Sequence, residues 1–138
     1  MKLTELKSEQ YFKIVTGIII ALVIFLALGA FRSSARDEQR FSNLKEIQGS
    51  LHLYYLKFQV YPIELGELEK AGIGLRSVPK DPRGSDYTYA ASDDHQYYVL
   101  MATFQDYANY HLKDDIDGLV NGINCDDRPS YNYCVGNL

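Results

Sequence analysis

One uncharged run near the amino terminus constrains this chain more than any other feature. Residues 14 to 31, IVTGIIIALVIFLALGAF, carry no charged side chain, and Tyr11 and Phe12 lengthen the apolar stretch to about 20 residues. As a helix this stretch is roughly 30 Å long, which matches the hydrocarbon core of a bilayer. The rest of the chain amounts to about one small domain, which could hardly cover a segment that is apolar on all sides. The sequence therefore predicts a transmembrane helix rather than a core helix.

A cleaved signal peptide is the alternative to a retained anchor. Ala27, Leu28 and Gly29 offer small residues at a suitable spacing, but the apolar region of a signal peptide is usually only about 7 to 15 residues long. The length therefore favours an anchor that stays in place. The charges beside it do not set its orientation, because both flanks are basic: Lys2, Lys7, Lys13, Arg32, Arg36 and Arg40.

The two cysteines decide the orientation instead. Cys125 and Cys134 bracket the short segment DDRPSYNY, and such a pair predicts one disulfide that forms in an oxidising compartment. Two free thiols on a cytoplasmic domain are the alternative, and a zinc site lacks the usual ligand spacing because the three histidines are scattered. With the disulfide accepted, we expect a cytoplasmic amino terminus and an extracytoplasmic head.

Beyond the membrane segment the helical pattern continues. Apolar side chains recur at steps of three and four, and charged residues fill the positions between them. Pro62 disfavours helical geometry at Tyr61, so the helix is expected to end near Val60, and the segment LHLYYLKF is expected to be wrapped by the sheet of the head. From Tyr11 onward this helix would be roughly 70 Å long. Its apolar stripe comprises Phe41, Leu44, Ile47, Leu51, Tyr55 and Phe58.

The remaining sequence predicts a small α+β head. A short helix is expected within residues 63 to 73 and closed by Gly72, and DYTYA and HQYYVLMATF are typical of two antiparallel strands. YANYHL fits either a third strand or a loop, and the polar run beyond Lys113 predicts an ordered loop held by the disulfide. The expected organisation is a cytoplasmic segment (1–13), a transmembrane half-helix (14–31), an extracytoplasmic half-helix (32–60) and a globular head (61–138).

Three segments in order carry a family resemblance: ARDEQRFSNLKEIQGSLHLYY, YPIELGELEKAGI and VPKDPRGSDYTYA. They resemble type IV pilin-like proteins, most closely the major pseudopilins of type II secretion. The resemblance implies a pilin-like fold, in which a long helix packs on a small antiparallel sheet and a disulfide closes the carboxyl-terminal loop. It also implies a structural subunit of a filament built by helix packing. The head turn that carries the resemblance comprises Tyr61, Pro62, Pro79, Asp81, Pro82 and Gly84.

The amino terminus departs from that family. Its members begin with a short leader, then a Gly, a Phe and a Glu at the fifth mature position, whereas the matching positions here hold Ser8 and Lys13. In the family the negative charge of this Glu pairs with the positive amino terminus of a neighbouring subunit within the membrane. A Lys is itself positive and cannot form this pair. We therefore predict no prepilin-type cleavage. An unprocessed, membrane-anchored binding or assembly module that forms no filament is the alternative function.

Small residues along the membrane segment suit close packing of one helix on another, since lipid offers no hydrophobic drive between helices. We expect homo-oligomers, other pilin-like subunits and the membrane as partners. The residues expected at the membrane and filament contacts are Lys13, Gly17, Ile18, Ala21, Leu22, Phe25, Ala27 and Gly29.

Five aspartates gather toward the carboxyl end around Gly118 and Cys125. Carboxylates on a glycine-bearing loop are the oxygens that Ca²⁺ prefers, and the family resemblance implies calcium in this loop. Plain solvated turn chemistry is the alternative, because the run lacks the spacing of a helix-loop-helix calcium motif. The candidate ligands are Asp114, Asp115, Asp117, Asp126 and Asp127.

Catalysis and nucleic-acid binding find little support in the sequence. There is no GxSxG, HExxH or phosphate-binding glycine motif, and the adjacent Asp93 and Asp94 fall at a predicted hairpin tip. Past Phe31 the acidic residues outnumber Lys and Arg, which leaves no basic face for phosphates. We expect no enzyme and no nucleic-acid partner.

Overall fold

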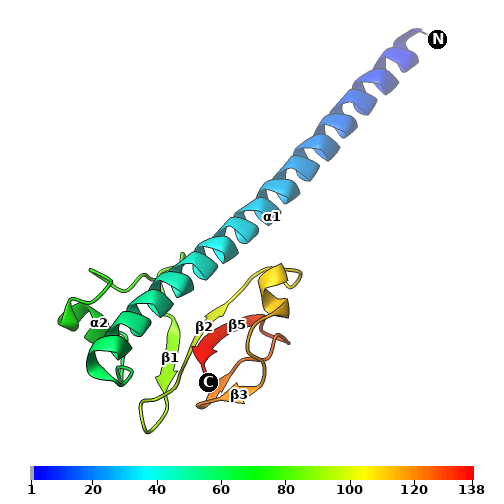
Figure 1. Cartoon of the computed structure of the whole chain (residues 1–138). Coiled ribbons are helices and arrows are strands. Elements are labelled where there is room, and N and C mark those ends of the chain that lie inside the picture. Colours follow the sequence, from blue (N-terminus) through cyan, green and yellow to red (C-terminus); the bar gives the residue numbers. More distant parts are fainter. Residues whose placement is uncertain (1) are drawn as a thin grey trace. The chain divides into compact units, whose positions relative to one another are not determined.

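A computed structural model describes the backbone of residues 2–138 and the side chains from residue 8 onward. The chain divides into two compact units, Met1–Ser33 and Ser34–Leu138, and each is described by itself. One α-helix, α1 (Lys2–Phe58), contributes its first part to the first unit and its second part to the second (Figure 1). The half-helix and the head, which the sequence divided at residue 60, thus belong to the same compact unit.

The first unit is a single apolar helix whose surface is uncovered. Every side chain from Ser8 to Arg32 is exposed, including the large apolar ones. By length and composition this part of α1 is suited to cross a membrane. The predicted long apolar helix is confirmed.

The second part of α1 lies on the head and buries one stripe. Leu44, Ile47 and Leu51 are completely buried, and their spacing of three and four residues puts them on one face of the helix. The helix ends at Phe58, close to the predicted position. The expectation for LHLYYLKF was only partly right, because Leu53 and Leu56 face away from the head and are 48% and 59% exposed.

The helix α2 (Gly66–Ala71) follows the turn after α1. Leu68 is its buried residue and packs into the main core. Gly72 ends the helix in the left-handed conformation, with φ of 63°, and its N–H reaches the carbonyl oxygens of Leu68 and Glu69. A residue with a Cβ would be strained at that φ, so the predicted glycine cap is confirmed.

The head contains a three-stranded antiparallel sheet in the order β1-β2-β5 (Figure 1). The predicted hairpin is confirmed as β1 (Thr88–Ala91) and β2 (Tyr98–Thr103), with Tyr89 opposite Leu100. The prediction of a loop beyond Lys113 was wrong, because β5 (Asn132–Asn137) pairs along the whole of β2.

The strand β5 is not recognisable from the hydrophobic pattern of the sequence, because polar residues and glycine flank its apolar centre. Its apolar centre is only Tyr133-Cys134-Val135, and both of its faces are buried, so no alternation of exposed and buried residues marks it. A two-stranded ribbon, β3 (Leu119–Val120) and β4 (Ile123–Asn124), precedes it. The segment YANYHL, which fitted either a strand or a loop, ends in the 3₁₀ helix η1 (Tyr110–Lys113).

The sheet separates two clusters of buried side chains. The larger one joins the buried stripe of α1 to α2 and to residues of β2 and β5 such as Leu100 and Tyr133. The smaller one contains Val99, Ile123 and the two half-cystines, with Ile116 packed against it. The second cluster lies under the acidic segment and anchors it to the sheet.

The head turn carries the residues of the resemblance. Tyr61 and Pro62 are buried, and the hydroxyl of Tyr89 donates to the Pro62 carbonyl oxygen at 2.8 Å. Pro79 precedes and Pro82 lies within a turn in which the N–H of Gly84, a residue at φ of 94°, donates to the Asp81 carbonyl oxygen at 2.7 Å. The turn therefore holds the Asp81 carboxylate in a fixed place.

A buried ion network lies where the sequence analysis placed polar surface. Arg40 is 2% exposed and Asp37 is fully buried. The Arg40 guanidinium donates to Asp37 Oδ1 at 2.6 Å and to both carboxylate oxygens of Asp81, at 2.5 and 3.0 Å. Asp37 also accepts from the backbone N–H groups of Gln105 and Asp106 at 2.9–3.0 Å. The network ties α1 to two distant loops.

Candidate functional site

The residues predicted for membrane and filament contacts all lie on the exposed surface of the first unit. A Cβ added to Gly17 or Gly29 would meet nothing within 4 Å, so neither glycine is required by packing within the chain. The single chain gives these positions no partner among its described residues. The set comprises Lys13, Gly17, Ile18, Ala21, Leu22, Phe25, Ala27 and Gly29.

In the head, the structure brings three of the five candidate calcium ligands together. One carboxylate oxygen each of Asp115, Asp117 and Asp127 lies within 4.8 Å of the other two. Asp114 and Asp126 are exposed and do not belong to this group. The three carboxylates come from both sides of the β3–β4 ribbon, so a fold contact, and not sequence proximity alone, creates the cluster.

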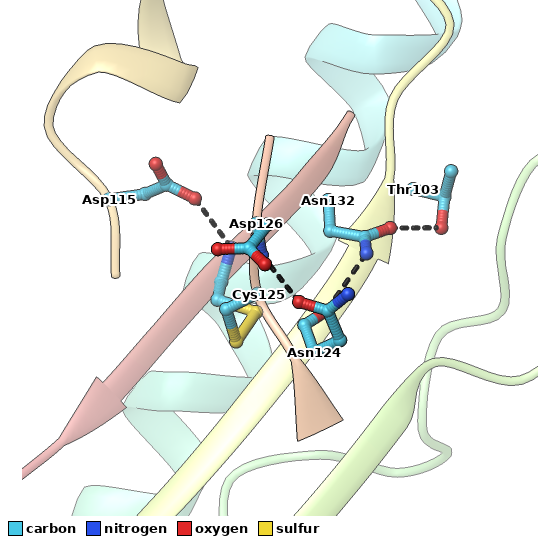
Figure 2. The surroundings of a disulfide bond; sticks show 7 residues. Thr103, Asp115, Asn124, Cys125, Asp126 and Asn132 are labelled. Carbon is cyan, nitrogen blue, oxygen red and sulfur yellow. Dashed lines mark hydrogen bonds between the residues drawn. A yellow bond between two sulfur atoms is a disulfide. The ribbon is translucent and has the colours of Figure 1, made fainter. Parts of the chain in front are cut away.

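The disulfide and the edge of β5 hold this acidic cluster in place. Cys125 and Cys134 are bonded with an S–S distance of 2.08 Å, which confirms the predicted pairing. The backbone N–H of Cys134 donates to Asp115 Oδ2 at 2.8 Å (Figure 2). The N–H of Cys125 donates to the Gly118 carbonyl oxygen at 2.8 Å, which closes the base of the β3–β4 ribbon next to Asp117.

A series of hydrogen bonds between polar residues lies beside the disulfide, on the side away from Asp115 (Figure 2). Thr103 donates to Asn132 Oδ1 at 3.0 Å, and the Asn132 amide donates to the Asn124 carbonyl oxygen at 2.9 Å. The Asn124 side chain then accepts from the N–H of Asp126 at 3.0 Å. The sequence analysis did not identify Asn124 or Asn132, because nothing in their spacing shows that two strands bring them together.

The electrostatics of the cluster are unfavourable for three ionised carboxylates. Burial, opposed by the hydrogen bond from Cys134 and reinforced by Asp127 and Asp117, raises the pKa of Asp115 to about 6. Burial and then the neighbouring Asp117 also raise the pKa of Asp127. The carboxylates of Asp115 and Asp127 thus resist ionisation in this cluster.

Two oxygens of the cluster have no hydrogen-bond donor among the residues that the structure describes. Asp115 Oδ1 and Asp127 Oδ1 are both buried and unpaired. A buried carboxylate oxygen without a donor is costly, and a divalent cation satisfies such oxygens while it cancels their mutual repulsion. The residues present therefore fit a hard cation such as Ca²⁺, with Asp115, Asp117 and Asp127 as the side chains that would hold it.

The histidines do not converge on a common site. His52 lies on α1, His95 in the turn between β1 and β2, and His111 in η1. His95 hydrogen-bonds the Tyr61 carbonyl oxygen, and His111 stacks on the ring of Phe41 at 3.6 Å. His111 Nε2 also lies 3.5 Å from Glu38 Oε2, and His52 is exposed.

The buried network of Asp37, Arg40 and Asp81 is the structural feature that sequence reasoning missed. Burial would raise the pKa of Asp81, but hydrogen bonds from Arg40 and from the Arg83 backbone hold it below its ordinary value. The spacing of Asp37 and Arg40, three residues apart on one helical face, was the available signal. It did not reveal that the pair is buried.

Comparisons of the chain with protein-family models, with curated proteins and with solved structures returned no match.

Proposed function

We propose that this chain is a membrane-anchored structural subunit of a type IV pilin-like filament, of the kind formed by the major pseudopilins of type II secretion. The observation that carries this proposal is the contrast within α1, an exposed apolar surface in its first part and a buried stripe in its second. The first part needs an apolar environment outside the chain. Lipid supplies that environment before assembly, and the helices of other subunits supply it in a filament.

The disulfide supports an extracytoplasmic head with a cytoplasmic amino terminus. Cys125 and Cys134 are bonded and fully buried in the second hydrophobic cluster. Disulfides of this kind belong to oxidising compartments, which lie on the outer side of the anchor.

The proposed role is structural rather than catalytic. The three histidines lie on separate elements, and Asp93 and Asp94 are exposed at the hairpin turn. Hydrogen bonds from Ser92 and the Gln96 backbone lower the pKa of Asp94, which is the opposite of what a general acid needs. We propose further copies and other pilin-like subunits as partners, and no nucleic acid.

A second candidate function is an anchored binding or assembly module that never leaves the bilayer. Lys13 favours it, because an exposed cation stands where the family carries the acid that pairs with a neighbouring subunit. On this alternative the amino terminus stays unprocessed, and the intact mass of the protein from membranes shows no loss of a leader.

A cysteine scan of α1 distinguishes the two functions. Cys125 and Cys134 are the chain's only cysteines and are bonded to each other, so one introduced cysteine is the only free thiol. Single replacements are made at each position from Gly17 to Gly29, and the membranes are treated with a mild oxidant. A filament subunit gives cross-linked dimers that recur with the helical period of about 3.6 residues. A monomeric module gives no such periodicity.

Shearing gives an independent readout. The filament proposal expects the chain among filaments sheared from the cell surface, and it expects replacement of Gly17 or Ala21 by Leu to reduce that fraction. Leu26→Ile, which keeps the side-chain volume at a position outside the predicted contact set, is the matched control. A chain that stays wholly with the membrane, and that shows no periodic cross-linking, would exclude a filament.

We also propose that the acidic cluster binds Ca²⁺ and so stabilises the carboxyl-terminal segment. Two observations support this proposal. The carboxylates of Asp115, Asp117 and Asp127 converge, and one oxygen each of Asp115 and Asp127 is buried and unpaired. When bound, the cation would supply the positive charge that these carboxylates lack. This would order the segment that runs from η1 to β5.

The calcium proposal is tested by thermal melting of the detergent-solubilised chain with Ca²⁺, with Mg²⁺ and with chelator. Calcium is expected to raise the melting temperature of the native chain and of Asp93→Asn, whose carboxylate lies outside the cluster. Asp117→Asn and Asp127→Asn are expected to lose the response. If the unsubstituted chain melts at the same temperature in calcium and in chelator, the calcium proposal is wrong.

A further inference from the structure

The loop that leads into η1 and the first residue of η1 each carry a strongly exposed tyrosine. Tyr107 is 71% exposed and Tyr110 is 62% exposed, whereas most tyrosines of the head are buried or half-buried. Exposure of two neighbouring large aromatic side chains on a small head calls for an explanation. Tyrosine has an apolar ring and a polar hydroxyl, which suits an environment that is apolar at one end and wet at the other.

This loop is rigid and is fixed to the first turns of the head's helix. Asp37 accepts from the backbone of Gln105 and Asp106, and His111 stacks on Phe41 at 3.6 Å. Within the loop, the Asp106 carboxylate accepts from the N–H of Ala108 at 2.9 Å. The exposed rings are therefore held on an ordered platform beside Asp37 and Phe41.

Chain connectivity keeps this platform close to the membrane boundary. The uncharged run ends at Phe31, and Asp37 follows only a few residues later. That stretch spans roughly 9 Å as a helix and at most about 20 Å fully extended. The base of the loop is therefore tied to a residue that lies within about 20 Å of the end of the uncharged run.

The two ends of the membrane segment differ in their interfacial aromatic residues. Tyr11 stands just before the apolar run at its inner end, where interfacial aromatics gather. Residues 32 to 40 after the run contain no Tyr, Trp or Phe. The outer interface thus lacks a tyrosine or tryptophan anchor from α1 itself, and the head offers two tyrosines, one in the loop before η1 and one at the start of η1.

We propose that Tyr107 and Tyr110 rest in the headgroup region of the outer membrane face while the subunit is still embedded in the bilayer. This inference rests on the anchored topology proposed above. The surface around η1 is of mixed charge, since the exposed Lys113 is accompanied by the exposed Asp114 and by Glu38 of α1, so the surface it fits is a zwitterionic bilayer. The contact would hold the head against the lipid until the subunit leaves the membrane.

Tryptophan reporters test this directly, because the chain contains no Trp. Tyr110→Trp is reconstituted as the full chain in phosphatidylcholine vesicles, with lipid brominated near the headgroup end of its acyl chains as the quencher. Tyr97→Trp is the matched control. It is also an exposed tyrosine of the head, but the adjacent Gln96 contacts Tyr55 and Gln59 at the far end of α1. Figure 1 shows the two segments, residues 110–113 in gold and the β1–β2 turn, at opposite ends of the sheet.

The expected result is blue-shifted emission and loss of intensity in brominated vesicles for Tyr110→Trp, with neither change for Tyr97→Trp. Phe25→Trp, inside the membrane segment, reports on the anchor itself. Quenching at position 25 without quenching at position 110 overturns the lipid contact and leaves the anchored topology standing. Loss of quenching at position 25 overturns the topology. Emission from position 110 that shifts only as protein is concentrated in the vesicles also overturns the lipid contact, in favour of another copy.

Discussion

The two parts of α1 differ in which side chains they bury. Between residues 14 and 31 the helix is uncharged, and all its large apolar side chains are exposed. A few turns later the same helix buries two charged residues, Asp37 and Arg40, as completely as it buries Leu44. Residue type alone predicts the reverse of this burial in a soluble protein.

The difference lies in the partners that each part has within its own compact unit. Asp37 and Arg40 are buried because Asp81 and two backbone N–H groups satisfy their charges and hydrogen bonds. The apolar residues before Ser33 have no sheet within their unit to pack on. Burial therefore follows the partners that are available within each compact unit.

The largest expected effect comes from breaking the buried charge network. Arg40→Ala leaves Asp37 and Asp81 without their cation and is expected to reduce the free energy of unfolding by about 3 to 5 kcal/mol. Urea denaturation of the full chain in detergent measures it. Arg32→Ala removes an exposed arginine of the same helix and is expected to change little. Equal costs for the two variants would contradict the burial of Arg40.

A matched pair of leucines gives the next largest effect. Leu44→Ala opens a cavity in the main core and is expected to cost about 2 to 5 kcal/mol in the unfolding of the head. Leu22→Ala, on the exposed apolar part, is expected to leave that free energy unchanged. The same denaturation experiment compares them, and a loss of head stability at Leu22 would show that the two units are energetically coupled.

A smaller effect concerns the acidic cluster, in calcium-free buffer. The pKa of Asp115 is raised to about 6, so the folded state binds its proton more tightly than the unfolded chain does. This stabilisation is fully present below the ordinary carboxyl pKa of about 4 and is lost as the pH rises through about 6.

Asp115→Asn keeps an oxygen that can accept from Cys134 but removes the charge. It is expected to stabilise the calcium-free head by about 1 to 2 kcal/mol at neutral pH, allowing for partial exposure of the carboxylate, and to make no difference near pH 4. Unfolding free energies of both chains across this pH range measure the effect. A benefit that does not vary with pH would show that charge is not its cause.

The smallest expected effect concerns the exposed leucines on the second part of α1. Leu53 and Leu56 are exposed, so Leu53→Ser and Leu56→Ser are expected to change the stability of the single chain by less than about 0.5 kcal/mol. If these variants nevertheless weaken filaments, a neighbouring copy covers this face in the assembly. Sheared-filament yield beside denaturation separates the two effects.

Much of the fold could be predicted because local patterns specify it. The helix end before Tyr61, the cap at Gly72, the β1–β2 hairpin and the disulfide each follow from residues close in sequence. The strand β5 could not be predicted, because its short apolar centre Tyr133-Cys134-Val135 acquires strand character only when it pairs with β2.

The candidate metal site was predictable only in part. The sequence identified the acidic residues, but it could not separate Asp115, Asp117 and Asp127, which converge, from Asp114 and Asp126, which lie outside the cluster. That distinction depends on the antiparallel ribbon and on the contact between Asp115 and the backbone of β5. These contacts form between segments whose spacing in the sequence carries no signal.

The sequence by itself determined the uncharged helical run, the continuation of that helix into a head, and the cysteine pair. Each depends on composition or on a short period, and a helix satisfies its backbone hydrogen bonds locally. Only the tertiary structure decided that Arg40 is a buried link between Asp37 and Asp81, and which three aspartates converge. These arrangements depend on long-range contacts, in which burial and hydrogen-bond partners come from residues distant in the chain.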